Sequence, residues 1–238
     1  MPTRKTLCGM WIHLAAQWSA AADSFQLMAL NNAENRQLAT LLMYDGMGLL
    51  DFGGPYEVLH TANRLCERAG ENPPFEIVTA SPTGDAVTAD GGVVVTPHCA
   101  AKDVRNAALV IVPGTVDLKS AGSDKHLAAA VQHLSSAEIM ASVCTGAFLL
   151  GDAGLLTGRP WTTHQESIPA LRDRLAAAGE TEFHPRAATS ARVLDDDTVI
   201  TAGGFTCGMD LTLNLVSRLA SADLAKRVAE HLEFSWSD

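Results

Sequence analysis

The chain has 238 residues, of which 47% are hydrophobic and 18% are charged. This length and apolar content suit one large folded domain and exclude an intrinsically disordered protein. A formal net charge of −10 repels phosphate backbones and anionic membranes, so we predict neither nucleic acid nor membrane as a partner.

The cysteines fit no disulfide framework and no metal site. Their number is odd, no pair has Cys-x-x-Cys spacing, and the gaps match no zinc pattern. The five are Cys8, Cys66, Cys99, Cys144 and Cys207. We therefore predict a metal-free protein in a reducing, cytoplasmic compartment.

The first 36 residues differ in character from the remainder. Arg4 and Lys5 precede a short apolar run, as in a secretory signal, but His13 and Gln17 interrupt that run. We predict a poorly ordered extension over residues 1–36 and a single domain over 37–238, with export as the alternative. No run in the sequence approaches the ~18–20 apolar residues of a membrane span.

From residue 37 onward, strand-like and helix-like segments alternate. A continuous aliphatic run at 37–44 predicts a buried strand, and after a Gly-rich turn a helix is expected over 55–70, with Pro55 in its first turn. The other expected elements, in chain order, are a strand at 75–80, a hairpin at 86–98, a strand at 108–114, a helix from a Ser123 cap to Leu134, a strand at 138–143, a helix at 166–179, a hairpin at 191–204, and helices at 207–220 and 222–233.

This alternation predicts an α/β fold with a mostly parallel sheet and helices on both of its faces. In such folds, ligands bind at the carboxyl ends of the strands. We therefore expect the functional site where polar or reactive residues directly follow a strand.

Cys144 is the first candidate at that edge, because it follows the strand at 138–143. The small residues Thr145, Gly146 and Ala147 come next, as in a tight strand-to-helix turn that presents a nucleophile. The unpaired N–H groups at the start of a helix favour a thiolate. The alternative is a buried, inert cysteine, which is the reading we favour for the other four.

Two further groups are expected at the same edge. The stretch YDGMGLLDFGGPYEVL (44–59) is a weak match to a dinucleotide-binding fingerprint, because Asp51 takes the place of the third glycine. Asp51 can instead lie near Cys144, or cap the helix that begins near residues 53–55. Gly114 ends the strand at 108–114, and its amide can pair with the Thr145 amide to stabilise an anion.

These edge segments resemble the ThiJ/PfpI superfamily, which has the fold of class I glutamine amidotransferases. They are most similar to its isonitrile (isocyanide) hydratase subgroup. The matching segments are LLDFGGPYEVL (49–59), LVIVPG (109–114), SVCTGAFLLGDAGLLTG (142–158), TTH (162–164) and TAGGFTCGMDLTLNLV (201–216). Many members carry His after the cysteine and a Glu from the first strand. Thr145 and Asp51 stand here instead, which disfavours a peptidase-like Cys–His pair and fits the hydratase pattern.

The resemblance implies hydration of an isocyanide to an N-substituted formamide, with no cofactor. Cys144 would attack the terminal carbon, Asp51 would act as general acid and then as general base, and Thr145 would orient Asp51 or water. The Gly114 and Thr145 amides would stabilise developing charge.

The same resemblance implies a pocket for a small-molecule substrate. Thr115 replaces the second glycine found in many members and is expected at the pocket mouth. Phe205 is expected to narrow the pocket, with Gly204 and His164 also lining it.

Three other readings stay open from the sequence. Similar domains form the amino-terminal half of AraC-type regulators, so a small-molecule sensor is one. A redox or stress-response protein, in which Cys144 oxidises reversibly, is another. Glyoxalase-type or deglycase chemistry is the third, and Thr145 disfavours it. Because relatives are commonly dimers, we also expect a homodimer.

Overall fold

The computed structural model describes residues 36–179 and 191–236. Apart from Arg36, the predicted extension over 1–36, with its signal-like stretch and Cys8, lies outside the described residues. Within the described ranges, no helix has both the length and the apolar character needed to cross a bilayer.

A seven-stranded sheet forms the centre of the domain, in the order β5-β2-β1-β6-β7-β9-β8. All neighbouring strands run parallel except β8 and β9. The strands are β1 (Gln37–Leu42), β2 (Phe75–Ser81), β5 (Cys99–Ala100), β6 (Leu109–Val112), β7 (Ile139–Val143), β8 (Val193–Asp196) and β9 (Val199–Ala202). The predicted fold class, an α/β fold with a mostly parallel sheet, is confirmed.

Both predicted hairpins are also present. Strands β3 (Val87–Thr88) and β4 (Val94–Val95) pair antiparallel as a separate two-stranded sheet. Gly91 lies in their turn with φ of 86°, a backbone region that glycine adopts without strain. The second hairpin, predicted over 191–204, is formed by β8 and β9 at the edge of the main sheet.

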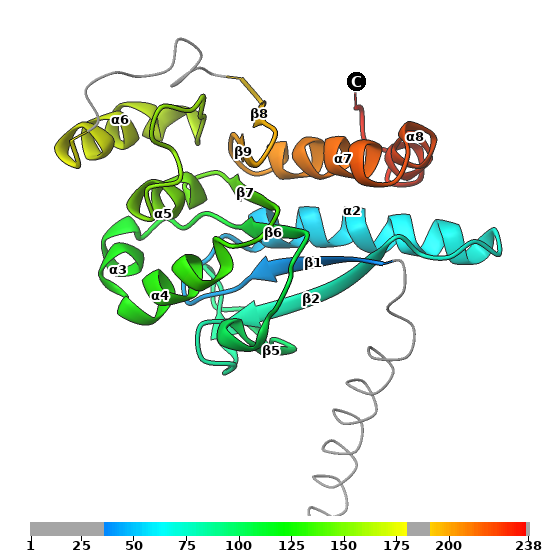
Figure 1. Ribbon diagram of the computed structural model, residues 1–238, viewed down its shortest axis with the longest axis horizontal. Coiled ribbons are helices and arrows are strands. Elements are labelled where there is room, and N and C mark those ends of the chain that lie inside the picture. Colours follow the sequence, from blue (N-terminus) through cyan, green and yellow to red (C-terminus); the bar gives the residue numbers. More distant parts are fainter. Residues whose placement is uncertain (1–35, 180–190, 237–238) are drawn as a thin grey trace, which may run out of the picture. The chain divides into compact units, whose positions relative to one another are not determined.

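The helices form two groups on opposite sides of the strands (Figure 1). One group contains α2 (Leu49–Arg68), α7 (Cys207–Leu219) and α8 (Ala222–His231). The other contains α3 (Leu118–Ser123), α4 (Lys125–Leu134), α5 (Gly146–Asp152) and α6 (Ile168–Ala177). Short 3₁₀ turns, η1 (Ala101–Asp103) and η2 (Gln165–Ser167), complete the helical elements of the described residues.

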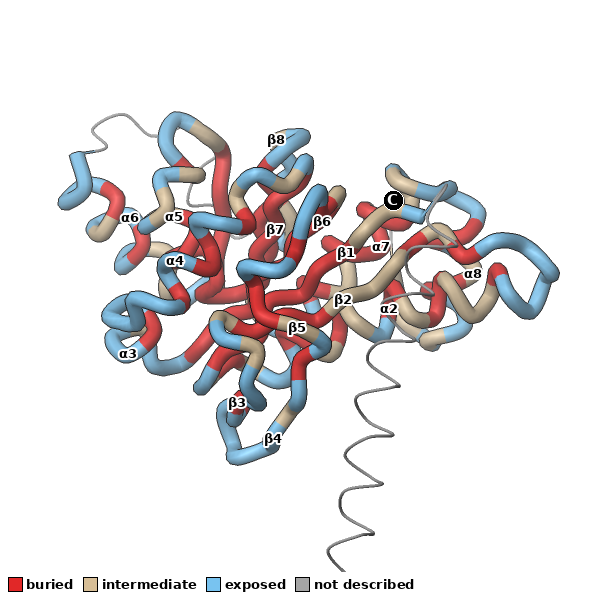
Figure 2. The backbone as a smooth tube through the Cα atoms, turned by 60° about the horizontal axis from the view of Figure 1, so that its bottom comes forward, coloured by how far each residue is buried: buried red, intermediate tan, exposed pale blue. Residues whose placement is uncertain are grey.

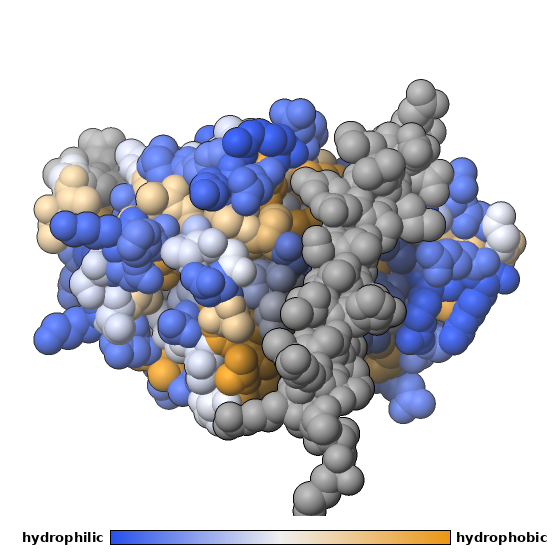
Figure 3. Space-filling model, turned by 90° about the horizontal axis from the view of Figure 1, so that it is seen from below, coloured by the Kyte–Doolittle hydropathy of each residue, from blue (hydrophilic) through white to orange (hydrophobic). Residues whose placement is uncertain are grey.

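Burial follows this layered arrangement. The central strands are buried along most of their length, whereas the helices expose their outer sides (Figure 2). Hydrophilic residues cover much of the face seen in Figure 3, with smaller apolar patches between them. A continuous aliphatic sequence in β1, β6 and β7 is therefore explained by helices on both faces of the sheet.

Helix α2 begins earlier than predicted. It starts at Leu49 rather than near Pro55, so Pro55 lies inside the helix. The Gly-Pro pair, which normally marks a helix boundary, is retained here because α2 packs closely on α7. A Cβ at Gly54 would lie 3.1 Å from Met209 Cγ, and a Cβ at Gly208 would lie 3.2 Å from Pro55 Cγ.

The cap of α4 is also shifted by one residue. We predicted Ser123, but Ser123 ends the short helix α3, and the N-cap of α4 is Asp124. Its carboxylate accepts hydrogen bonds from the N–H groups of His126 at 2.8 Å and Leu127 at 3.1 Å. An Asp side chain satisfies two free N–H groups of the first turn, which explains the later start.

The strand order reverses direction at the centre of the sheet. From β1 the chain continues outward to β2 and β5, whereas from β6 it continues the other way, through β7 to β9. Ligands of open α/β sheets bind at the carboxyl ends of the strands beside such a reversal. The segments that follow β1, β6 and β7 carry Asp51, Gly114 and Cys144.

Candidate active site

The turn that holds Cys144 is strained and tightly supported. Cys144 has φ of 57°, which is uncommon for a residue other than glycine. Its N–H donates to the carbonyl oxygens of Ala202 at 3.1 Å and Gly203 at 2.8 Å, and its own carbonyl accepts from the Thr163 hydroxyl at 2.8 Å. A Cβ at Gly146 would lie 2.4 Å from the Val112 carbonyl oxygen, so the turn requires glycine there.

Asp51 meets Cys144 at this edge. It is the third residue of α2, is 2% exposed, and does not cap the helix, whose N-cap is Gly48. Its Oδ1 accepts the Phe205 N–H at 3.1 Å. The Gly114 N–H and the Cys144 side chain also interact with this carboxyl group and lower its pKa. The structure therefore brings together the carboxyl and the thiol that the sequence placed after different strands.

Burial determines the protonation of this pair. It raises the pKa of the Asp51 carboxyl, although the bonds from Cys144, Phe205 and Gly114 lower that pKa in part. Burial and the nearby Asp51 raise the pKa of Cys144 to about 12, against a smaller lowering by Thr145. The thiolate we predicted from the helix N-terminus is thus wrong for the resting site, because desolvation outweighs the N–H groups at the start of the short helix α5. The raised pKa of Cys144 therefore favours a neutral thiol next to the Asp51 carboxyl group.

The Thr145 hydroxyl is hydrogen-bonded to the loop after β6 and not to Asp51. It donates to the Thr115 carbonyl at 2.6 Å and accepts the Thr115 N–H at 2.7 Å. The predicted orientation of Asp51 by this hydroxyl is therefore not seen, because the backbone of Thr115 occupies it. Thr115 itself is 5% exposed, and its hydroxyl donates to the Gly46 carbonyl at 2.8 Å. It is tied to the loop after β1, and its place at a pocket mouth stays a prediction.

The amide of Gly114 was expected to stabilise developing charge on a substrate, and this stays a prediction. In the structure the Gly114 N–H interacts with the Asp51 carboxyl and lowers its pKa. The Thr145 N–H remains directed at the Cys144 sulfur. The carbonyl of Gly114 accepts the Gly48 N–H at 2.7 Å, which joins the loop after β6 to the start of α2.

Replacing Gly114 with alanine is expected to destabilise the protein by about 1–3 kcal/mol, as over-packing does. The new Cβ would lie 2.7 Å from the Thr145 nitrogen and 2.8 Å from Asp51 Oδ2. Gly53→Ala is the matched control, because no atom lies within 4 Å of its Cβ position, inside a helix. That variant should gain about 0.5–1 kcal/mol. Urea unfolding measures both, and equal effects of the two changes would contradict the crowding at Gly114.

Phe205, Gly204 and His164 lie together beside the thiol–carboxyl pair. The Phe205 ring is 52% exposed and meets the His164 ring edge-on, with centroids 5.8 Å apart. A Cβ at Gly204 would lie 2.4 Å from His164 Cδ2, so glycine permits this contact. We predicted a narrowing role for the Phe205 side chain, but its link to Asp51 is through its N–H.

A cavity of about 240 Å³ borders these three residues. Neither Cys144 nor Asp51 lines it, whereas Gln165, Arg192 and Cys207 do, and these were missed in the sequence. The complete lining is Thr163, His164, Gln165, Ala191, Arg192, Gly203, Gly204, Phe205 and Cys207. The Arg192 guanidinium is paired with Asp210, so its charge is largely neutralised.

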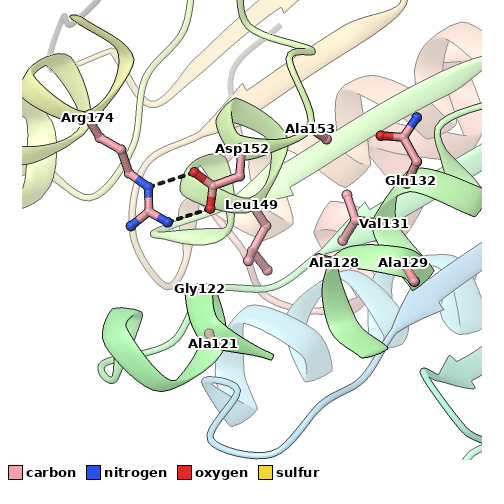
Figure 4. A pocket seen from close by; sticks show the side chains of 10 residues that line it. All are labelled: Ala121, Gly122, Ala128, Ala129, Val131, Gln132, Leu149, Asp152, Ala153 and Arg174. Atoms are coloured by element: carbon pink, nitrogen blue, oxygen red, sulfur yellow. Dashed lines mark hydrogen bonds and ion pairs between the residues drawn. The ribbon is translucent and has the colours of Figure 1, made fainter. Parts of the chain in front are cut away.

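A second cavity, of about 560 Å³, lies among helices α3, α4, α5 and α6 (Figure 4). Its walls are mostly alanines and other apolar residues. At one end Arg174 makes two 2.6 Å hydrogen bonds to Asp152. None of the predicted site residues lines this cavity.

Tyr44 was not identified from the sequence. It is 2% exposed, and its hydroxyl donates to the Pro113 carbonyl at 2.7 Å. Burial, together with the nearby Asp51 and Cys144, raises the pKa of Tyr44 above its ordinary value. The signal that could have found it is a phenol two residues after the buried strand β1, on the same edge as the site.

Several exposed apolar residues are neighbours of site residues in the sequence. Leu49 and Leu50 directly precede Asp51, and Val116 follows Thr115. Together with Phe205 they account for four of the six large apolar residues found exposed in the described ranges; the set is Leu49, Leu50, Val93, Val94, Val116 and Phe205.

Neither a metal site nor a disulfide is found in the described part of the chain. No group of three or more His, Cys, Asp or Glu side chains there is placed to hold a metal ion. The cysteines described, Cys66, Cys99, Cys144 and Cys207, are free thiols.

Comparison with known proteins finds relatives of several kinds. The isonitrile hydratase of Pseudomonas putida is 28% identical over 195 residues, which are 82% of this chain and 77% of that protein. The HTH-type transcriptional regulator GbdR of Pseudomonas aeruginosa is 28% identical over 197 residues, 82% of this chain but 50% of the regulator. The chain thus spans about half the length of that regulator.

The fold is shared with solved structures as well. A ThiJ/PfpI family protein from Pseudomonas syringae superposes with a TM-score of 0.71 at 26% identity, covering 86% of this chain and 77% of the other. Residues 37–218 match the DJ-1/PfpI family, and this range contains Asp51, Gly114 and Cys144. The chain therefore belongs to the DJ-1/PfpI family.

Proposed function

We propose that the chain is a cysteine-dependent hydratase that adds water to an isocyanide and releases an N-substituted formamide. The observation that carries the proposal is the closeness of the buried Cys144 thiol and the buried Asp51 carboxyl, each of which shifts the pKa of the other. Isocyanide hydration requires a nucleophile and a proton at one carbon atom, and this pair supplies both. The similarity to an isonitrile hydratase over most of the chain supports the same reaction.

The first step forms a covalent thioimidate. Asp51 accepts the thiol proton as the Cys144 sulfur attacks the terminal carbon of R–NC, and the carboxyl returns that proton to the same carbon. The product is R–N=CH–S–Cys144, in which a carbon–sulfur bond and a carbon–hydrogen bond have formed and the S–H bond has broken. Because the proton moves within the pair, a Cys144 pKa of about 12 is compatible with attack at neutral pH.

The second step consumes water. Asp51, again a carboxylate, removes a proton from a water molecule that adds to the thioimidate carbon, and then delivers that proton to the nitrogen. Collapse of R–NH–CH(OH)–S–Cys144 expels the sulfur, which regains its proton, and leaves R–NH–CHO. The Thr145 N–H, which faces the sulfur, favours negative charge there during both steps.

The surroundings favour a neutral, apolar substrate. Leu49, Leu50, Val116 and Phe205, at or next to predicted site residues in the sequence, are exposed apolar residues, and the formal net charge of −10 opposes the approach of anions. An isocyanide with a hydrocarbon substituent satisfies both conditions.

The test is incubation of the purified protein with benzyl isocyanide, followed by proton NMR of the formyl hydrogen. Benzylformamide should accumulate with many turnovers per protein molecule. In deuterated water the formyl carbon should carry deuterium, because the delivered proton comes from an exchangeable thiol. An isocyanide that persists as it does in buffer alone would remove the proposal.

A second candidate is a small-molecule sensor. The match to GbdR supports it, since this chain aligns with half of a transcriptional regulator. A sensor would bind its ligand without converting it. Calorimetry that detects isocyanide binding with no formamide in the same sample would favour this candidate over the hydratase.

A redox role is less well supported by the site. Reversible oxidation needs an accessible thiolate, whereas Cys144 is 8% exposed and burial raises its pKa to about 12. Transfer of the thiol proton to Asp51 during substrate attack requires no free thiolate at rest.

A further inference from the structure

The peptide group between Pro113 and Gly114 is held at both ends. Its carbonyl oxygen accepts a 2.7 Å hydrogen bond from the Tyr44 hydroxyl. Its Gly114 end lies against Asp51: a Cβ at Gly114 would lie 2.8 Å from Asp51 Oδ2, and the Gly114 N–H and the Cys144 side chain both lower the pKa of that carboxyl. Neighbouring groups therefore connect a buried phenol, through one peptide group and one carboxyl, with the nucleophilic sulfur.

The next peptide group is held by different partners. The Gly114 carbonyl accepts the Gly48 N–H at 2.7 Å, and the Thr115 N–H donates to the Thr145 hydroxyl at 2.7 Å. These bonds fix the Gly114–Thr115 peptide and do not involve the preceding one. If the Pro113–Gly114 peptide rotated, its carbonyl oxygen and not its N–H would face Asp51.

Gly114 cannot restrict that rotation by itself. Glycine has the widest conformational freedom of any residue, and this position excludes a side chain because a Cβ would lie 2.8 Å from Asp51 Oδ2. The restraint must come from a neighbour, and Tyr44 provides one on the carbonyl side.

We propose that Tyr44 is a positioning residue of this site, whose hydroxyl fixes and polarises the Pro113–Gly114 peptide so that the Gly114 N–H stays on Asp51. A hydrogen bond to a carbonyl strengthens the N–H of the same peptide as a donor. A stronger donor stabilises the ionised carboxyl, and only the ionised carboxyl can accept the thiol proton. The inference rests on the pairing of Asp51 with Cys144 in the proposed function, and not on the identity of the substrate.

The test is a carbon-13 NMR titration of the Asp51 carboxyl in the full-length chain, with the signal assigned by its absence in Asp51→Asn. Tyr44→Phe keeps the ring and removes the hydroxyl. It should raise the midpoint of the Asp51 titration by about one pH unit, because one of the bonds that stabilise the carboxylate is weakened. The acid limb of the hydration rate should move to higher pH by the same amount.

Tyr56→Phe is the matched control. Tyr56 is the other of the two tyrosines in the chain, and it stacks on Phe52 at 5.9 Å and on His60 at 6.0 Å within α2. This variant should leave the Asp51 midpoint unchanged. A loss of general stability in Tyr44→Phe, without a shift of the Asp51 midpoint, would show a merely structural role and overturn the proposal.

A second measurement should shift the midpoint of the Asp51 titration in the opposite direction. In the Tyr56→Phe background, 3-fluorotyrosine can replace Tyr44 alone, and its more acidic hydroxyl is a better donor. The Asp51 midpoint should then fall, and no change would overturn the proposal even if Tyr44→Phe did not fold. A protein that fails to hydrate isocyanides would refute the proposed function, but the carboxyl titration would still decide the role of Tyr44.

Discussion

Cys144→Ala is expected to abolish formamide production, with a fall in rate of at least about 10³-fold. Without the sulfur no thioimidate can form, and Asp51 alone has no nucleophile to activate except bulk water. Alanine accepts the positive φ of this turn no worse than cysteine does, and the N–H bonds to Ala202 and Gly203 are retained. Rates of formyl hydrogen appearance under saturating isocyanide measure the effect.

Cys99→Ala provides the comparison. Cys99 is a free, partly buried thiol on the short strand β5, at the opposite end of the strand order from β8. This variant should hydrate isocyanides at the wild-type rate. If Cys144→Ala, folded as judged by circular dichroism, kept more than a few per cent of the activity of Cys99→Ala, covalent catalysis would be ruled out.

The meeting of Asp51 and Cys144 was predictable because of how parallel sheets are built. The carboxyl ends of β1, β6 and β7 lie side by side at the centre of the sheet, so residues that follow these strands converge. Aliphatic runs identified those strands, and the resemblance at 49–59 and 142–158 identified Asp51 and Cys144. From its position at the sheet edge alone, Asp51 could equally have been a helix cap. The start of α2 at Leu49, earlier than predicted, excludes that role.

The protonation of the pair could not be read from the sequence. The position of Cys144 before a helix predicted a thiolate. That prediction considered only the N–H groups at the start of the helix and not the burial of the sulfur. Burial comes from residues distant in the chain, and it raises the pKa of both Asp51 and Cys144. Desolvation of a charged group is a property of the packed interior, so only the assembled fold reveals it.

Hydrogen-bond partners across the site were equally inaccessible. Thr145 and Thr115 are thirty residues apart, and their mutual bonds depend on how the loops after β6 and β7 approach one another. The N–H of Phe205 reaches Asp51 because the turn after β9 adopts φ of 52°. Residue type suggested a pocket-lining ring, and Phe205 does line a cavity. Its N–H is in addition a donor to the carboxyl, which residue type could not show.

Asp51→Asn is expected to lower the hydration rate by about 10²–10⁴-fold, the usual contribution of a positioned general acid or base. An amide of nearly the same shape cannot accept the Cys144 proton. It also meets two N–H donors, from Gly114 and Phe205, and its own NH₂ group must face one of them. The loss should appear in kcat, because proton transfer occurs in the chemical steps. Asp173→Asn, an exposed position on α6, should leave the rate unchanged.

Comparison with Asp51→Asn also predicts in which direction the stability of the wild-type protein changes with pH. Burial raises the pKa of Asp51 above its value in the unfolded chain, so ionisation of this carboxyl opposes folding. Its favourable contribution is complete below the unfolded pKa and is lost as the pH rises through the folded pKa. Wild type should therefore lose stability relative to Asp51→Asn between about pH 4 and pH 8. Urea midpoints at the two pH values measure this difference. A gain of wild type over the variant with rising pH would mean that hydrogen bonds to the carboxylate outweigh its burial, and Asp51 would then be too weak a base to take a proton from a buried thiol.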